Sequence, residues 1–230
     1  MTRVISAADA PDLLSRLDDA GSESVAPAGG AAYLAVKRVL DIVLSVALLV
    51  LLSPVMLLTA LLVKLSSRGP IIFSQTRAGT DGQPFTMYKF RTMRSGAQDD
   101  VDFLRHRNYQ NGPVFKLPED PRLTFVGKFL RRSSIDELPQ LFNVLRGEMS
   151  LVGPRPLWLP EAQRTTGAAR LRMKVTPGLT CLWQISGRSE LTYEQWILLD
   201  LYYLRSRGLL LDLLIMVQTI PAVLCGHGAY

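Results

Sequence analysis

Cysteine and histidine are scarce in this chain, and their scarcity removes several classes of chemistry. Of 230 residues, two are cysteines, Cys181 and Cys225, and two are histidines, His106 and His227. The cysteines show no paired spacing, so neither a disulfide framework nor a zinc site is indicated. The histidines lack the partners that a His-based metal site or a Ser-His triad requires. Acid-base or nucleophilic chemistry therefore has to come from carboxylates.

Common phosphate-binding signatures and targeting signals are also missing. Neither a P-loop nor a G-x-G-x-x-G run occurs, and no internal repeat is visible. Residues 1–32 mix Ala, Asp, Ser, Pro and Gly, without the basic start and apolar core of a signal peptide. We expect a mobile tail here, with one short helix around residues 12–17.

Basic residues outnumber acidic ones, and the imbalance lies outside the tail. The net charge is +6, although residues 1–30 contain five acidic and two basic residues. The remainder of the chain therefore has a net charge of +9. A basic body beside apolar segments suggests anionic partners, namely lipid headgroups, phosphates or nucleic acid. Nucleic acid is the least favoured, because the basic residues lack interleaved exposed aromatics and adjoin a segment suited to lipid.

One long apolar run dominates the first third of the chain. Of residues 39–63, 20 of 25 are apolar, enough for a helix to cross a hydrocarbon core of about 30 Å. Ser53 and Pro54 interrupt it near the middle, where proline leaves the Val50 carbonyl without its usual donor and Ser53 can replace that donor. Basic residues flank both ends: Lys37, Arg38, Lys64 and Arg68. Because cytoplasmic flanks attract such residues, we favour a re-entrant hairpin over residues 33–66, broken at Ser53 and Pro54, with an ordinary kinked span as the alternative.

Two adjacent carboxylates, Asp136 and Glu137, are the strongest candidates for chemistry. Pro139 is tolerated only in a first helical turn, so we expect a helix to begin near Asp136, with its positive end at the carboxylates. Apolar residues at helical spacing predict its buried face: Leu138, Leu141, Phe142 and Leu145. A simpler interpretation is that Ser134 and Glu137 form a capping box without catalytic function.

Cations occur at defined positions around this pair in the expected fold. A strand over residues 85–93 places Lys89 and Arg91 on one face, where they could grip a phosphate. A short helix over residues 125–132 delivers Arg131 to the carboxylates. Arg155 lies between Pro154 and Pro156, whose fixed φ angles immobilise it. Arg188 follows a glycine turn and is a further candidate for phosphate contact.

The remaining segments complete an α+β fold with short strands. We expect a strand over residues 71–75, a turn over 176–180 and a helix over 191–205. We expect residues 95–121 to form a long loop that contains one helix near residues 98–107. For residues 209–224 we expect a helix at the membrane interface, interrupted at Pro221. Trp183 is assigned to the core.

Five motifs in order resemble those of the bacterial sugar transferases, the monotopic phosphoglycosyl transferases that act on polyisoprenyl phosphate. They are the Ser53 and Pro54 segment, YKFRTM (88–93), DELPQLFNV (136–144), SLVGPRP (150–156) and PGLT (177–180). The resemblance covers roughly residues 36–225. It implies a re-entrant helix hairpin that anchors a small catalytic domain, here residues 67–230, on the cytoplasmic face of the bacterial inner membrane. It also implies transfer of a sugar 1-phosphate from a UDP-sugar to undecaprenyl phosphate, with release of UMP, at the start of exopolysaccharide or glycoconjugate assembly.

The resemblance also assigns roles to residues. Asp136 corresponds to a nucleophile that forms an acyl-phosphate intermediate, and Glu137 supports it, with Mg²⁺ near the pair. Positions that shape the substrate site in the family are matched by Lys89, Arg131, Arg155, Arg188 and Asp200. The WQISGR segment (183–188) resembles members that handle glucose or galactose, although Ser189 and Cys181 depart from the family pattern. A non-catalytic membrane module that binds anionic lipid or nucleotide is the alternative, and a homodimer is left open.

Overall fold

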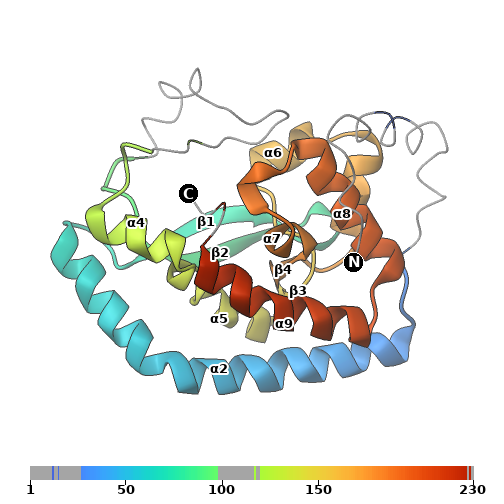
Figure 1. The fold of residues 1–230 in the computed structure, drawn as a ribbon, viewed down its shortest axis with the longest axis horizontal. Helices are drawn as coiled ribbons and strands as arrows, with labels where there is room; N and C mark the ends of the chain where they lie inside the picture. The colour runs from blue at the N-terminus through green and yellow to red at the C-terminus, as the bar shows by residue number, and fades with distance from the viewer. Residues whose placement is uncertain are drawn as a thin grey trace.

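The computed structural model of the chain has the expected α+β fold, in which helices surround a few short strands (Figure 1). It describes Asp12, Ser15, residues 27–97, Leu117, residues 120–226 and Gly228. Most of the predicted tail, the predicted helix over 98–107 and both histidines lie outside the described residues.

The described elements form one helical body with two small sheets. The α-helices are α2 (Ala31–Ser66), α4 (Phe125–Arg132), α5 (Gln140–Arg146), α6 (Leu159–Arg164), α7 (Leu182–Ile185), α8 (Tyr193–Ser206) and α9 (Leu209–Cys225). Short 3-10 helices are η2 (Thr80–Gly82), η4 (Ile135–Glu137), η5 (Gly167–Lys174) and η6 (Arg188–Glu190). Strands β1 (Ile72–Ala78) and β2 (Pro84–Phe90) pair antiparallel, and β3 (Ser150–Val152) pairs in parallel with β4 (Gly178–Thr180). Strand β4 replaces part of the predicted turn over 176–180.

Helix α2 runs along one edge of the molecule and bends, and both of its ends join the same body (Figure 1). It continues through Pro54, so the predicted break of the helix at this position is wrong. The predicted compensation is confirmed, since the Ser53 hydroxyl donates to the Val50 carbonyl over 2.8 Å. This hydrogen bond satisfies the carbonyl that proline leaves without a donor, which allows the helix to bend without ending.

The two faces of α2 are inverted relative to those of a helix in a soluble protein. Its buried residues are Asp41, Ser45, Thr59 and Val63, and three of these four are polar. The Leu151 backbone N–H donates to the Asp41 carboxylate over 2.9 Å, which ties α2 to β3. The outward face is made of leucine and valine side chains that are largely exposed, such as Leu51 at 73% and Leu57 at 72%. Because α2 is long and apolar enough to cross a membrane, lipid is the environment that this face suits.

The basic residues at the start of α2 contact protein. Lys37 forms an ion pair of 2.8 Å with Asp212 of α9. The Arg38 guanidinium donates to the Val144 and Leu145 carbonyls at the end of α5, over 2.6 and 2.8 Å. These contacts fasten the start of α2 to α5 and α9.

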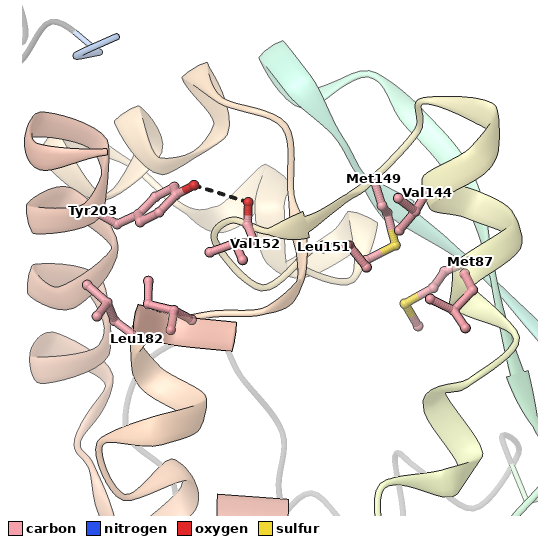
Figure 2. Close-up of a cluster of buried hydrophobic side chains, with 9 residues drawn as sticks. Met87, Val144, Met149, Leu151, Val152, Leu182 and Tyr203 are labelled. Atoms are coloured by element: carbon pink, nitrogen blue, oxygen red, sulfur yellow. Dashed lines mark hydrogen bonds between the residues drawn. The ribbon is translucent and has the colours of Figure 1, made fainter. Parts of the chain in front are cut away.

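One cluster of buried hydrophobic side chains joins β2, α5, β3, α7, α8 and α9 (Figure 2). Its buried members include Met87, Val144, Met149, Leu151, Val152, Leu182 and Tyr203. Figure 2 shows the Tyr203 side chain directed at the Val152 carbonyl oxygen, 3.1 Å away. The hydroxyl also lies 2.8 Å from the Asp212 carboxylate, so one buried tyrosine links α8, β3 and α9.

One expectation about α5 and one about α9 are wrong. In α5 the buried side chains include Leu141 and Val144, whereas Phe142 is 48% exposed. Phe125 and Phe129 of α4 are exposed as well, at 92% and 62%. Helix α9 is not interrupted at Pro221 and continues to Cys225. Helical periodicity marks an apolar stripe, but it does not say whether protein or lipid covers that stripe.

Candidate active site

Asp136 and Glu137 lie in the turn η4, between α4 and α5, and both carboxylates are buried. Ser134 precedes them in the left-handed conformation, with φ of 55°, and its side chain caps nothing. The Glu137 carboxylate instead accepts hydrogen bonds from Lys89 Nζ at 2.6 Å and Arg155 Nη2 at 3.0 Å. The capping-box interpretation is therefore wrong. The helix also starts later than expected, because α5 begins only at Gln140.

The pKa values of the two neighbouring carboxylates are shifted in opposite directions. Burial raises the pKa of Asp136 to about 6, and repulsion from Glu137 adds to this effect. Burial also acts to raise the pKa of Glu137, but attraction to Lys89 and Arg155 outweighs it and holds that pKa well below the usual range. Glu137 is thus a permanent anion that neutralises two cations. Asp136 is a carboxylate whose charge is poorly compensated, which suits a nucleophile.

Arg131 reaches the dyad because α4 packs tightly against the end of the β2 segment. The Thr124 hydroxyl caps α4 by accepting from the Gly127 N–H at 2.9 Å. A Cβ at Gly127 would lie 1.9 Å from the Thr92 carbonyl oxygen, so this approach requires glycine. Arg131 Nε then donates to the Thr92 hydroxyl over 3.2 Å. Burial lowers the pKa of Arg131, and attraction to Asp136 partly offsets that effect.

Arg155 is held in the site from several sides. Pro154 and Pro156 on either side of it are buried. Its guanidinium contacts Glu137 and lies 5.5 Å from the centroid of the Trp183 ring. Trp183 is in the core, as predicted, and it also supports this cation.

Arg188 lies near the dyad in space, although it belongs to η6, about 50 residues later in the sequence. It is only 4% exposed, and its φ of 52° places the backbone in the left-handed region. Its Nε donates to the Gln184 carbonyl at 3.3 Å, while Nη2 has no hydrogen-bond partner among the described residues. Burial lowers the pKa of Arg188, and attraction to Glu137 opposes this. A buried guanidinium with an unused donor beside a carboxylate pair can bind a phosphate oxygen.

Two residues predicted for the substrate site form contacts with other parts of the protein. Strand β2 ends at Phe90, so the alternation that paired Arg91 with Lys89 does not continue. The Arg91 guanidinium donates to the Ser67 carbonyl at 2.8 Å and the Arg68 carbonyl at 2.5 Å, which closes the end of α2. Asp200 is buried in α8, where it forms an ion pair of 2.6 Å with Arg172.

Two arginines near the site were missed by the sequence analysis. Arg77 of β1 and Arg172 of η5 both hydrogen-bond to carbonyls of residues 154–156. A basic residue near the end of a strand was a weak indication for Arg77. No local pattern indicates Arg172, because its role depends on Asp200, 28 positions later in the sequence.

Asp136 and Glu137 are the residues that could hold a divalent metal here. Among the described residues, no group of three or more His, Cys, Asp or Glu side chains is gathered closely enough to form a metal cage. Two adjacent carboxylates do fit Mg²⁺, which commonly binds one or two carboxylates and takes its other ligands from water and phosphate oxygens.

The family model for bacterial sugar transferases matches residues 32–226, nearly the whole extent from α2 to α9. The chain belongs to this family. Bacterial sugar transferases with which it shares about 40% identity differ in length. The exopolysaccharide production protein ExoY of Sinorhizobium fredii is 40% identical, and the match covers 90% of this chain and 92% of that protein.

Longer bacterial sugar transferases match over a similar share of the chain. The undecaprenyl-phosphate galactose phosphotransferase of Salmonella typhimurium is 40% identical over 84% of this chain and 41% of its own length. The undecaprenyl-phosphate glucose phosphotransferase of Komagataeibacter xylinus is 41% identical, over 84% and 37% respectively. The chain therefore spans less than half the length of these two relatives.

Proposed function

We propose that this bacterial sugar transferase moves a hexose 1-phosphate, from UDP-glucose or UDP-galactose, to undecaprenyl phosphate and releases UMP. One observation carries the proposal: the buried Asp136 carboxylate lies next to Glu137, whose own charge is paired with Lys89 and Arg155. The names of the Salmonella and Komagataeibacter relatives support this lipid acceptor and these two hexoses. The UDP-galactose-lipid carrier transferase of Erwinia amylovora supports a UDP-linked donor.

In the proposed reaction, an Asp136 carboxylate oxygen attacks the phosphorus that bears the sugar. The bond from this phosphorus to the bridging oxygen breaks, and UMP leaves with the electron pair. An oxygen of undecaprenyl phosphate then attacks the same phosphorus and releases the Asp136 carboxylate. The product is undecaprenyl diphosphate carrying the sugar.

Cations make this attack feasible, because an anionic nucleophile has to approach an anionic diphosphate. Lys89 and Arg155 neutralise Glu137 and still present positive charge to the donor. Arg131 adds positive charge near Asp136, and Arg188 adds positive charge near Glu137. Mg²⁺ held by Asp136 and Glu137 would neutralise further charge on the diphosphate oxygens.

The apolar surface supports a membrane location for the acceptor. The outward face of α2, together with Phe125 and Phe129 of α4, is covered by exposed apolar side chains. We propose that α2 enters one leaflet and returns, so that the catalytic body rests on the cytoplasmic face of the inner membrane. Labelling that placed residues 30 and 70 on opposite sides of the membrane would overturn this topology.

The activity is tested by UMP release from UDP-glucose and UDP-galactose in membranes that contain undecaprenyl phosphate and Mg²⁺. Asp136→Asn should abolish release, and wild-type protein incubated with labelled donor should carry phosphate on residue 136. Arg170→Gln, an exposed change in η5, should leave release unchanged. Normal turnover by Asp136→Asn would refute the mechanism and favour a non-catalytic module that binds anionic lipid or nucleotide.

A further inference from the structure

All three carbonyl oxygens of residues 154–156 are held by groups from other parts of the fold. The Gly178 backbone N–H, in β4, donates to the Pro154 carbonyl at 2.9 Å. Arg172 Nη2 donates to the Arg155 carbonyl at 2.8 Å. Arg77 Nη1 donates to the Pro156 carbonyl at 3.3 Å.

The prolines explain why such external support is needed. Proline has no N–H, so this tripeptide has a single backbone donor and cannot hold itself in a strand ladder. Proline fixes φ but leaves ψ free, so the direction of the Arg155 side chain depends on what binds the carbonyls. Two of the three donors are guanidinium groups, which form stronger hydrogen bonds than neutral donors do.

Arg172 is itself immobilised. It is 2% exposed, and it forms an ion pair of 2.6 Å with Asp200. Its guanidinium carbon also lies 4.5 Å from the centroid of the Trp196 ring. Asp200 and Trp196 both belong to α8, so Arg172 connects that helix to the Arg155 backbone.

Arg77 contacts the same segment from a different element. It lies in β1, and its backbone forms an isolated bridge with Trp158, two residues beyond Pro156. Burial lowers the pKa of Arg77 to about 10, and the side chain is close enough for Arg155 and Glu137 to influence it. One short segment is thus bound by β1 through Arg77 and, through Arg172 of η5, is linked to α8.

We infer that Arg77 and Arg172 are positioning residues, which hold the backbone of residues 154–156 so that the Arg155 guanidinium stays against Glu137 and the Trp183 ring. This inference rests on the proposed function, because Arg155 matters for turnover only if the site binds a diphosphate. It predicts that both arginines act through Arg155 and not on the substrate.

The competing possibility is that these arginines only stabilise the fold. A double-mutant cycle separates the two, because a residue that acts through Arg155 has no effect once Arg155 is removed. The cycle uses Arg77→Gln, Arg155→Ala and the double variant. Arg170→Gln is the matched control, since Arg170 is exposed on the same 3-10 helix as Arg172.

We expect Arg77→Gln to lower kcat/KM for the UDP-sugar by about 10-fold to 100-fold, as a small misplacement of a binding group does. In the Arg155→Ala background the same change should alter kcat/KM by less than about threefold. An equal loss in both backgrounds would overturn the inference, as would a loss of less than about twofold in the wild-type background.

Arg172 requires a paired change, because a single substitution would leave Asp200 buried without its cation. Arg172→Gln combined with Asp200→Asn keeps an amide donor for the Arg155 carbonyl. We expect partial rescue relative to Arg172→Met combined with Asp200→Leu, which has no such donor. Equal activity of the two folded double variants would overturn the role of Arg172.

A readout without turnover separates this inference from the proposed function. In protein labelled with 5-fluorotryptophan, Arg155→Ala should shift the ¹⁹F resonance of Trp183, and Arg77→Gln should shift it in the same direction. Arg170→Gln should not shift it. An unshifted Trp183 signal in Arg77→Gln would overturn the positioning role. A shifted signal in a protein that never releases UMP would support positioning and refute the proposed activity.

Discussion

Replacing the proposed nucleophile should make the protein more stable while it abolishes activity. Asp136 is 5% exposed, and burial raises its pKa from 3.8 to about 6. A raised carboxyl pKa means that the folded protein holds the ionised form less favourably than the unfolded chain does. Asp136→Asn removes that ionised group and should therefore increase the free energy of unfolding at neutral pH.

The magnitude follows from the shift of about two pKa units, each worth about 1.4 kcal/mol. Asp136→Asn should raise the free energy of unfolding by about 3 kcal/mol above pH 6. For a chain of this size, such a gain corresponds to about 6 to 12 °C in Tm. Below the unfolded pKa of 3.8 the wild-type residue is protonated in both states, so the gain should vanish there. It should therefore grow between about pH 4 and 6 and then stay constant.

Glu137→Gln provides a control of opposite sign. The pKa of Glu137 is lowered, so its ionised form stabilises the fold above the unfolded value of 4.5 and this stability is lost on acidification. Glu137→Gln should consequently destabilise at pH 8. Thermal unfolding of purified protein in detergent, followed by tryptophan fluorescence at pH 5 and pH 8, measures both variants. A decrease in Tm for both variants at pH 8 would refute the electrostatic division of the dyad.

Three further predictions concern separate parts of the structure. As Asp136 takes up a proton, kcat/KM should fall about tenfold per pH unit below about pH 6, and a rate that is constant down to pH 5 would contradict this. Arg91→Gln should lower the free energy of unfolding, measured by chemical denaturation, by about 2 kcal/mol and leave the KM for UDP-sugar unchanged. Lys89→Gln should raise that KM. The reversed pattern would place Arg91 in the substrate site. Gly178→Ala should lower Tm much more than Gly30→Ala. A Cβ at Gly178 would lie 2.0 Å from a backbone nitrogen of the facing segment, whereas one at Gly30 would meet nothing within 4 Å. Equal Tm values for the two variants would contradict the close pairing of β3 and β4.

Features that depend on neighbouring residues were predictable. The apolar run of residues 39–63 indicated the membrane helix, and the Ser53 hydrogen bond at its bend was expected from the missing proline donor. Helix α4 has the predicted bounds, since its N-cap and apolar spacing are local. The carboxylate pair was found because the two residues are adjacent and because five ordered motifs resemble those of one family.

Features that depend on distant partners were not predictable. Lys89 and Arg91 differ by two positions, yet one binds Glu137 and the other binds the end of α2. Sequence spacing cannot distinguish them, because their roles depend on which carbonyl or carboxylate the fold brings within reach. Phe142 shows the same limit, since its side chain follows a helical period but faces away from the protein core.

The sequence by itself determined which chemical groups are present and where the chain is apolar enough to prefer lipid, and it indicated carboxylates as the candidates for the chemistry. Only the tertiary structure decided which of the two carboxylates is neutralised, because that depends on cations from β2 and from residues 154–156 converging on Glu137 and not on Asp136. Charge compensation falls steeply with distance and grows with burial, and both quantities exist only once the chain has folded.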